Sequence, residues 1–377
     1  MEGVKPPLSM SAAKGEIMVQ VPLKDYVYAN ARVRAMNARL LDQDVFKNML
    51  DAPDYNRAIA VLEETEYGED IEHFMMEGAR PTTMDRAFNR NFVRSFSHIK
   101  DFFMGKPEEM VGALLSRWDL YNLKTVLRGM RALVPKSEIM RNLIPIGSLD
   151  QVTLEEIANQ PDLRASLDVI VMFSLQWDIP YGQAISANLN EFLREHDLSI
   201  LELALDKFHY EKVMGMLKGG DANTRLVREV VTMEVDAINI GTLMRICGLE
   251  LTDTKAEDYF VPGGTIATAK EFARILELKQ PEQVYEALCR KTPYRKALEA
   301  AWRNFDERGE SAFEDEMEKH IIETCLKMSK DPLGIGVIIE YMWKKYLEIT
   351  NLRIILRGKS IGLIESQIRK ELFVWDA

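Results

Sequence analysis

The chain has 377 residues, enough for two or three domains that each bury a hydrophobic core. Apolar residues make up 47% of it and charged residues 28%, and this ordinary globular composition excludes disorder for the bulk of the chain. There are 48 Lys and Arg against 59 Asp and Glu, a net charge of −11, so the surface repels phosphate backbones and we expect no nucleic-acid binding.

Taken in chain order, the predicted elements are helices. The first 24 residues are expected to form a flexible tail, since they lack the apolar core of a signal peptide. Apolar residues then recur at three- and four-residue spacing, which predicts helices over 87–104, 110–133, 191–216 and 331–357. Strand-like alternation and hairpin turn pairs are hard to find. The sequence therefore predicts an all-α fold.

Two features concern the compartment. The apolar run over 169–177 is much shorter than the ~20 residues that a membrane-spanning helix needs. Cys247, Cys289 and Cys325 form no CxxC pair, and an odd number of widely separated thiols suits a reducing compartment. We expect a cytoplasmic protein whose contact with any membrane runs through a partner.

One pattern of residues occurs three times along the chain. Each copy has an acidic residue three positions before an Asn, Leu or Ile directly after the Asn, and an Arg six positions after it. The asparagines lie 117 and 112 residues apart, and a Tyr precedes each of them by 55–58 residues. The copies, each written as Tyr, acid, Asn and Arg, are Tyr67, Asp119, Asn122 and Arg128; Tyr181, Asp236, Asn239 and Arg245; and Tyr294, Glu348, Asn351 and Arg357. This repetition predicts three homologous helical domains, over 25–137, 138–250 and 251–377, after a tail of residues 1–24.

On a helix, the repeated acid and Asn fall inside the apolar arc and the Arg falls outside it. A buried polar group has to be hydrogen-bonded, since leaving it unpaired costs about 1–3 kcal/mol. Two interpretations are open. The acids and asparagines either tie neighbouring helices and helix ends together within each domain, or they line a central surface shared by the three domains.

The repeated arginines also allow two interpretations. Gly129 and Gly358 directly follow two of them and are expected to end the helices, so that the arginines interact favourably with the helix dipole. Alternatively, Arg128, Arg245 and Arg357 form a ring that faces a partner. These three arginines are the candidate partner-binding residues of the chain.

No set of residues indicates catalysis, a metal or a cofactor. Gly358-Lys359-Ser360 looks like the end of a phosphate-binding P-loop, but Arg353 stands where that loop requires Gly, and the segment ends a helix where a P-loop opens one. The five histidines form no HExxH pattern or paired spacing typical of a metal site. We therefore expect an adaptor without catalytic, cofactor-binding or metal-binding residues, with an all-α enzyme of unfamiliar site as an alternative.

Short segments spread over the chain carry a resemblance to a known family. They are Tyr-Val-Tyr-Ala-Asn-Ala-Arg-Val-Arg at 26–34 and the segments 62–67, 118–124, 127–128, 348–353, 362–364 and 368–369. Together they resemble the C subunit of prokaryotic V-type and archaeal A-type ATP synthases, the counterpart of the d subunit of eukaryotic V-ATPases. The likeness extends over about residues 25–374 and leaves out only the N-terminal tail.

The resemblance implies three similar helical domains around a pseudo-threefold axis, forming a funnel. It also implies a non-catalytic rotor part of the central stalk, which transmits torque between ion translocation and ATP synthesis or hydrolysis. One end of the funnel would sit on the membrane proteolipid ring, and the funnel would receive the central shaft, which is the D subunit with the small F subunit. The protein would bind no nucleotide and would lie at the cytoplasmic face of the membrane, which it would contact only through the ring.

An alternative of a different class is a helical-repeat scaffold unrelated to a rotary motor, with a concave peptide-binding face. The repeat period of about 114 residues argues against it, since the repeats of solenoid scaffolds run roughly 20–50 residues and lack cores of their own.

Overall fold

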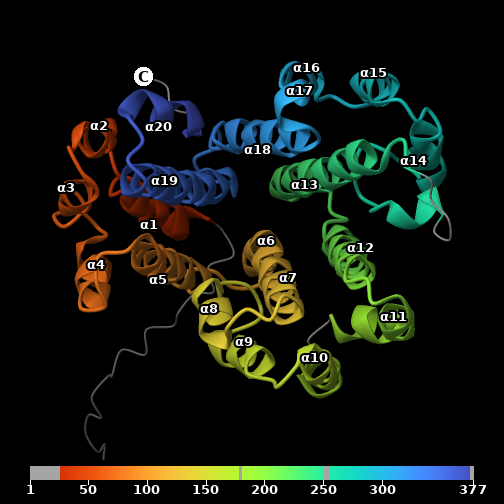
Figure 1. Ribbon diagram of the computed structural model, residues 1–377, viewed down its shortest axis with the longest axis horizontal. Coiled ribbons are helices and arrows are strands. Elements are labelled where there is room, and N and C mark those ends of the chain that lie inside the picture. The colour runs from red at the N-terminus through yellow and green to blue at the C-terminus, as the bar shows by residue number, and fades with distance from the viewer. Residues whose placement is uncertain (1–25, 178–180, 250–254, 374–377) are drawn as a thin grey trace, which may run out of the picture.

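The computed structural model describes residues 26–177, 181–249 and 255–373 (Figure 1). Every regular element within these ranges is a helix, which confirms the all-α prediction. The predicted tail, residues 1–24, lies outside the described ranges.

In chain order the helices are α1 (Val27–Asn37), α2 (Gln43–Asp51), α3 (Tyr55–Ala60), α4 (Gly68–Met75), α5 (Pro81–Lys100), α6 (Lys106–Leu115), α7 (Arg117–Arg131), α8 (Lys136–Arg141), α9 (Gln151–Ala158), α10 (Leu163–Trp177), α11 (Gly182–Glu195), α12 (Ser199–Met216), α13 (Ala222–Ile246), the 3-10 helix η1 (Ala256–Tyr259), α14 (Ala269–Leu276), α15 (Pro281–Lys291), α16 (Arg295–Arg303), α17 (Phe305–Arg308), α18 (Ser311–Cys325), α19 (Gly336–Ser360) and α20 (Glu365–Glu371). Aspartates begin several of them by accepting a hydrogen bond from the backbone N–H three residues on: Asp42, Asp54, Asp150 and Asp221.

Two of the predicted helices are interrupted. The range 110–133 is divided between α6 and α7 at Ser116, whose hydroxyl donates to the carbonyl of Ala113 at 2.8 Å and so competes with the backbone for that acceptor. The range 191–216 breaks after Glu195, because His196 adopts a left-handed conformation with φ of 56° and ends α11.

The helices follow one another around a ring. In Figure 1 the chain runs from α2–α4 at the left, through α8–α10 at the bottom and α11–α14 at the right, to α15–α18 at the top. The next helix, α19, returns to the beginning of the chain and packs against α1, α3 and α5. The first and last described segments are therefore neighbours in space.

Three long helical segments, α6 with α7, α13 and α19, lie towards the middle of this ring (Figure 1). Each is packed against a helix of the next group along the ring: α7 against α12, α13 against α18, and α19 against α5. The repeated acid, Asn and Arg lie on α7, α13 and α19. The three copies thus occupy comparable surroundings, while the division of the chain into three domains stays a prediction.

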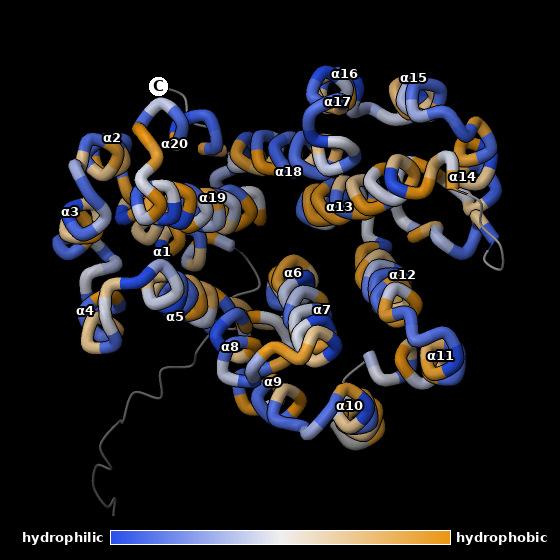
Figure 2. Tube along the Cα trace, in the orientation of Figure 1, coloured by the Kyte–Doolittle hydropathy of each residue, from blue (hydrophilic) through white to orange (hydrophobic). Residues whose placement is uncertain are grey.

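Hydrophobic side chains from all parts of the described chain form one buried cluster. Figure 2 shows hydrophobic and hydrophilic residues alternating along most helices, as expected of amphipathic helices. The largest fully buried side chains include Tyr67, Phe88, Phe96, Phe272 and Phe313. Within the described ranges, no helix combines the length and the apolar character needed to cross a membrane.

Candidate functional site

Each repeated asparagine pairs with a backbone residue 22 positions further along the chain. Its amide donates to the carbonyl and accepts from the N–H of the same residue, at 2.7–3.2 Å: Asn122 with Ile144, Asn239 with Val261, and Asn351 with Phe373. Among side chains, an amide carries both the donor and the acceptor that this pairing needs. The pairing supports the interpretation that these buried residues tie helices to neighbouring segments.

Each repeated acid is buried and reaches a segment beyond its own helix. Asp119 accepts hydrogen bonds from the N–H and hydroxyl of Ser148 and from the N–H of Leu149. Asp236 accepts from the N–H of Thr265 and the hydroxyl of Tyr294. Glu348 accepts from the N–H of Leu41 and the hydroxyl of Tyr67, and all seven bonds measure 2.5–2.8 Å. Burial raises the pKa of Asp119 and Asp236, and the bonds that they accept oppose this rise. The first two acids bind the segment that follows their helix, whereas Glu348 binds the beginning of the chain.

Two glycines let the backbone approach the acids closely. A Cβ on Gly147 would lie 2.1 Å from Oδ1 of Asp119, and one on Gly264 would lie 2.2 Å from Oδ1 of Asp236. Each glycine follows its acid by 28 residues. Sequence reasoning missed the close approach of both glycines to the acids, although their shared spacing is a signal that could have found it.

The acids and the repeated tyrosines define three junctions, which we call the first junction (Asp119 and Tyr181), the second junction (Asp236 and Tyr294) and the closure junction (Glu348 and Tyr67). In the second and closure junctions the tyrosine hydroxyl donates to the acid at 2.6 Å. In the first junction the hydroxyl of Tyr181 lies 3.0 Å from Nδ1 of His209, which is also buried. In the second and closure junctions the tyrosine thus bonds the acid of the preceding copy of the pattern, and in the closure junction the last acid meets the first tyrosine. In the first junction Tyr181 and Asp119 line the same cavity.

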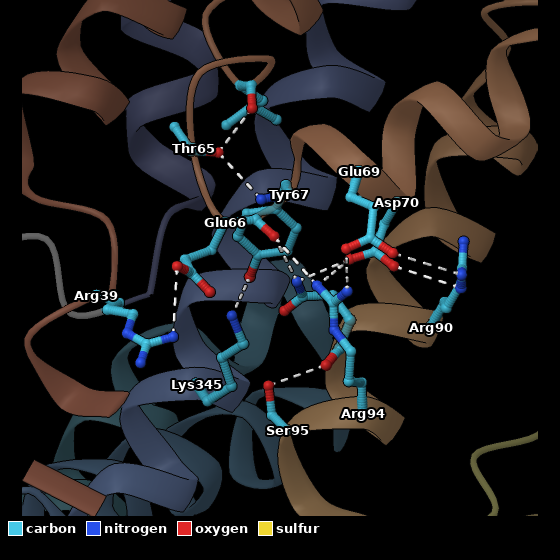
Figure 3. Close-up of polar contacts among 12 residues, drawn as sticks. Arg39, Thr65, Glu66, Tyr67, Glu69, Asp70, Arg90, Arg94, Ser95 and Lys345 are labelled. Carbon is cyan, nitrogen blue, oxygen red and sulfur yellow. Dashed lines mark hydrogen bonds and ion pairs between the residues drawn. The ribbon is translucent and has the colours of Figure 1, made fainter. Parts of the chain in front are cut away.

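The closure junction also contains a lysine, which the other two junctions lack at this position (Figure 3). Lys345 lies on α19 one turn before Glu348 and donates to Oε1 of Glu348 at 2.8 Å and to the hydroxyl of Tyr67 at 2.9 Å. Its ammonium is 4.3 Å from the centre of the Tyr67 ring, a cation–π contact. The side chains of Lys345 and Glu348 are each 4% exposed, so this ion pair is buried. Burial and the neighbouring Glu348 raise the pKa of Tyr67, which keeps its hydroxyl protonated.

Polar contacts between α4 and α5 hold the segment that carries Tyr67. Asp70, fully buried at the start of α4, accepts from Asn91 at 2.9 Å and from Arg94 at 2.8 Å. Arg94 also pairs with Glu69 at 2.8 Å. Figure 3 shows Asp70, Glu69 and Arg94 beside Tyr67. These contacts between α4 and α5 thus fix the position of the segment from which Tyr67 contacts α19.

Another set of contacts joins the three long helical segments. Arg117, Glu234 and Tyr346 all stand two residues before a repeated acid. Nη1 of Arg117 lies 2.8 Å from Oε1 of Glu234, and its guanidinium is 4.7 Å from the centre of the Trp343 ring on α19. Burial raises the pKa of Glu234, and Arg117 opposes that rise. Sequence reasoning missed this ion pair, although the fixed offset from the acids could have found it.

Each candidate partner-binding arginine forms an ion pair with a helix of the next group. The pairs are Arg128 with Glu202 on α12, Arg245 with Glu314 on α18, and Arg357 with Asp85 on α5. The three arginine side chains are 63, 55 and 62% exposed, in that order. All three stay accessible from solvent near the C-terminal ends of their helices.

The expectation that Gly129 and Gly358 end their helices is wrong, because α7 and α19 each continue for two further residues. The glycines instead permit close packing. A Cβ on Gly129 would lie 2.6 Å from Cγ1 of Ile139, and one on Gly358 would lie 2.6 Å from Cγ1 of Ile368. A Gly near a helix end here allows an isoleucine from another helix to pack closely, and it does not end the helix.

The P-loop-like segment ends α19, as expected, and Lys359 donates to the carbonyls of Leu50 and Ala52 at 2.6 and 2.5 Å. Among the residues that the structure describes, no group of His, Cys, Asp and Glu could hold a metal ion.

The first junction contains a histidine that should make stability depend on pH. Burial, and secondarily the charges of Lys124, Arg117 and Lys212, lower the pKa of His209 from 6.5 to about 3. Below pH 6.5 the unfolded chain binds a proton at this residue and the folded chain does not, so stability falls as the pH falls towards 3.

We expect this histidine to account for about 2 kcal/mol of the stability lost between pH 7 and pH 5, at roughly 1.4 kcal/mol per pH unit below 6.5. The loss should disappear in His209→Gln and persist in His196→Gln, which changes an exposed histidine. Urea unfolding at the two pH values measures it. An equal pH dependence in wild type and His209→Gln would contradict the assignment.

Comparison with known proteins gives a consistent set of similarities. A family described as ATP synthase (C/AC39) subunit matches residues 29–371. The chain is 26% identical over 354 residues to the C subunit of the A-type ATP synthase of Methanosarcina acetivorans, covering 93% of both chains. It is 25% identical to the corresponding A-type C subunit of Archaeoglobus fulgidus, covering 93% of this chain and 96% of that one. It is 28% identical to the C subunit of the V-type ATP synthase of Deinococcus radiodurans, covering 92% and 91%.

Proposed function

Since the chain belongs to the ATP synthase (C/AC39) subunit family, and is thereby part of a rotary V/A-type ATP synthase, we propose that it is the non-catalytic socket of the central stalk. In this role it links the membrane proteolipid ring to the central shaft, the D subunit with the small F subunit. It transmits torque between ion translocation and ATP synthesis or hydrolysis. It is a peripheral protein at the cytoplasmic face, binds no nucleotide, and contacts the membrane only through the ring. Family membership sets aside a scaffold unrelated to a rotary motor.

The closure junction carries this proposal. A part that passes torque through non-covalent contacts has to keep its shape under load, and an open row of helices would splay apart. In this chain the last long helix, α19, is tied to the first helices through the buried pair of Lys345 and Glu348 and through the hydroxyl of Tyr67. A closed ring of helices can hold a shaft and rest on a ring of identical subunits.

The contact chemistry follows from a mismatch of symmetry. A chain with three copies of one pattern cannot make the same contact with every member of a ring of many identical subunits, so we expect polar, adaptable contacts as in non-obligate interfaces. A buried apolar interface with the shaft above ~2,000 Å² would argue against this expectation.

The exposed arginines remain our candidates for partner contact. Ion pairs between exposed side chains are typically worth about 0–1 kcal/mol, so a partner carboxylate could replace the intramolecular one at little cost. We expect the triple variant Arg128→Ala, Arg245→Ala and Arg357→Ala to lose at most about 2 kcal/mol of stability and at least tenfold in affinity for the shaft or the ring.

Urea unfolding and a binding titration with each partner measure the two quantities. The matched control is Arg290→Ala, which removes an exposed ion pair outside the repeated pattern. Reduced stability with both affinities unchanged would assign the arginines a purely intramolecular role.

The proposed function is tested by removing this protein from the complex. Membranes with the intact complex and membranes stripped of this protein are compared for ATP hydrolysis and for ATP-driven ion pumping. We expect hydrolysis by the head to continue and pumping to be lost, with recovery when the purified protein is added back. Ion pumping at the normal rate without it would contradict the proposal.

A further inference from the structure

The first junction holds a cavity of about 310 Å³ between α6, α7 and α12. Its lining includes Asp119, Tyr181 and His209, and also Glu108, Glu109 and Lys212. The rest of its surface is mainly apolar. A concave, largely apolar space of this size with a few convergent polar groups has the general properties of a small-ligand site.

Two of the residues that line the cavity are small and stand at fixed positions before the repeated acid. Seven and three residues before the acid, the first junction has Gly112 and Ser116, whereas the closure junction has Tyr341 and Lys345. Both larger side chains are buried, at 3 and 4% exposure. A Cβ added to Gly112 would meet nothing within 4 Å. The first junction thus carries small residues at two positions of the repeated pattern where the closure junction carries large, buried ones.

The closure junction also shows which chemistry suits the space. There the butylammonium side chain of Lys345 packs on a tyrosine ring and bonds both the acid and the tyrosine hydroxyl. In the first junction the acid and the tyrosine are retained, while Ser116 stands in place of the lysine. An ionised carboxylate offers about four acceptor positions, and Asp119 uses three of them.

We propose that this cavity binds a primary alkylammonium ion on a short unbranched chain, which replaces in the first junction the lysine side chain of the closure junction. The ammonium lies between Asp119 and the hydroxyl of Tyr181, and the chain lies against the apolar wall formed by Val213 and Met216. The proposal rests on the comparison of the junctions and is independent of the rotor function.

The charges around the cavity are compatible with a cation. Three carboxylates line it, from Asp119, Glu108 and Glu109, against two lysines. One of these, Lys100, donates to the carbonyl of Gly147 at 2.6 Å, and its charge also lowers the pKa of Asp119, in opposition to the effect of burial. His209 adds no charge near neutral pH, since burial lowers its pKa to about 3.

The direct test is binding of n-butylammonium to the full-length protein, measured by titration calorimetry and saturation-transfer NMR in phosphate buffer free of other amines. The neutral probe 1-butanol has the same chain length. We expect n-butylammonium to bind at least tenfold more tightly than 1-butanol. Equal affinities, or no binding of either probe at millimolar concentration, would overturn the proposal.

Variants place the binding in the cavity. Ser116→Lys supplies the ammonium from the chain itself and should reduce the affinity at least tenfold, while Ser186→Lys, at an exposed position on α11, should leave it unchanged. Gly112→Leu fills the same space without charge and serves as the blocking variant if Ser116→Lys does not fold. Unchanged affinity in the folded blocking variants would overturn the assignment.

The source of the ammonium is distinguished by a third probe. Nα-acetyl-lysine N-methylamide carries the same group on a peptide backbone. Tighter binding of n-butylammonium than of this probe identifies a free amine as the ligand. Tighter binding of the lysine derivative identifies a lysine side chain of another protein, and either outcome supports the ammonium chemistry.

Discussion

Glu348→Ala should lower the free energy of unfolding by about 3–5 kcal/mol, the cost of leaving one charge of a buried ion pair uncompensated. The substitution leaves the ammonium of Lys345, whose side chain is 4% exposed, without its carboxylate partner. It also removes the acceptor for the hydroxyl of Tyr67 and the N–H of Leu41. Because this junction joins the last long helix to the beginning of the chain, the ring of helices should also open more readily.

Urea unfolding measures the first effect, and hydrogen exchange of α1 and α19 measures the second. The double variant Lys345→Met with Glu348→Leu should recover part of the lost stability, since it removes both charges and keeps the volume but leaves the hydroxyl of Tyr67 and the N–H of Leu41 without the Glu348 acceptor. Glu299→Ala, which breaks the exposed pair with Arg295, is the matched control and should cost less than about 1 kcal/mol. A Glu348→Ala loss as small as that of the control would refute the role of the closure junction.

Gly147→Ala should cost about 3 kcal/mol although it adds a single methyl group. Its Cβ would lie 2.1–2.6 Å from three atoms of the Asp119 carboxylate, which is held by three hydrogen bonds. The carboxylate has to move, so the variant combines overpacking with lost hydrogen bonds to Ser148 and Leu149.

Gly112→Ala is the matched control, because it makes the same change inside α6 where the new Cβ meets nothing within 4 Å. There the higher helix propensity of Ala should stabilise the protein by about 0.5–1 kcal/mol. Urea unfolding of both variants gives the comparison. Similar values for the two would show that the acid of the first junction tolerates displacement.

The repeated pattern could be predicted from the sequence because burial on a helix leaves a local, periodic signal. The acids and asparagines stand inside the apolar arc, and the structure buries all of them. Their partners could not be predicted, because a partner depends on the path of the chain between helices. Tyr67 meets Glu348 across 281 positions, and no local pattern reports a contact of that separation.

The wrong prediction that two glycines end their helices has a related explanation. Gly129 and Gly358 stand near helix ends, where local propensity favours a cap, but their function is to admit Ile139 and Ile368. Local sequence does not distinguish these two uses of a missing side chain. The cavity of the first junction leaves a signal in the sequence, since Gly112 and Ser116 stand where another copy of the pattern has Tyr341 and Lys345.

The most direct test of the proposed role is native mass spectrometry of the purified protein with the detergent-solubilised proteolipid ring and with the shaft, the D subunit bound to the F subunit. A socket between ring and shaft should bind the ring as one copy per ring, and the mass of that complex should then increase by one copy of the shaft. Failure to bind either partner, under conditions in which the ring and the shaft are each intact, would contradict the account.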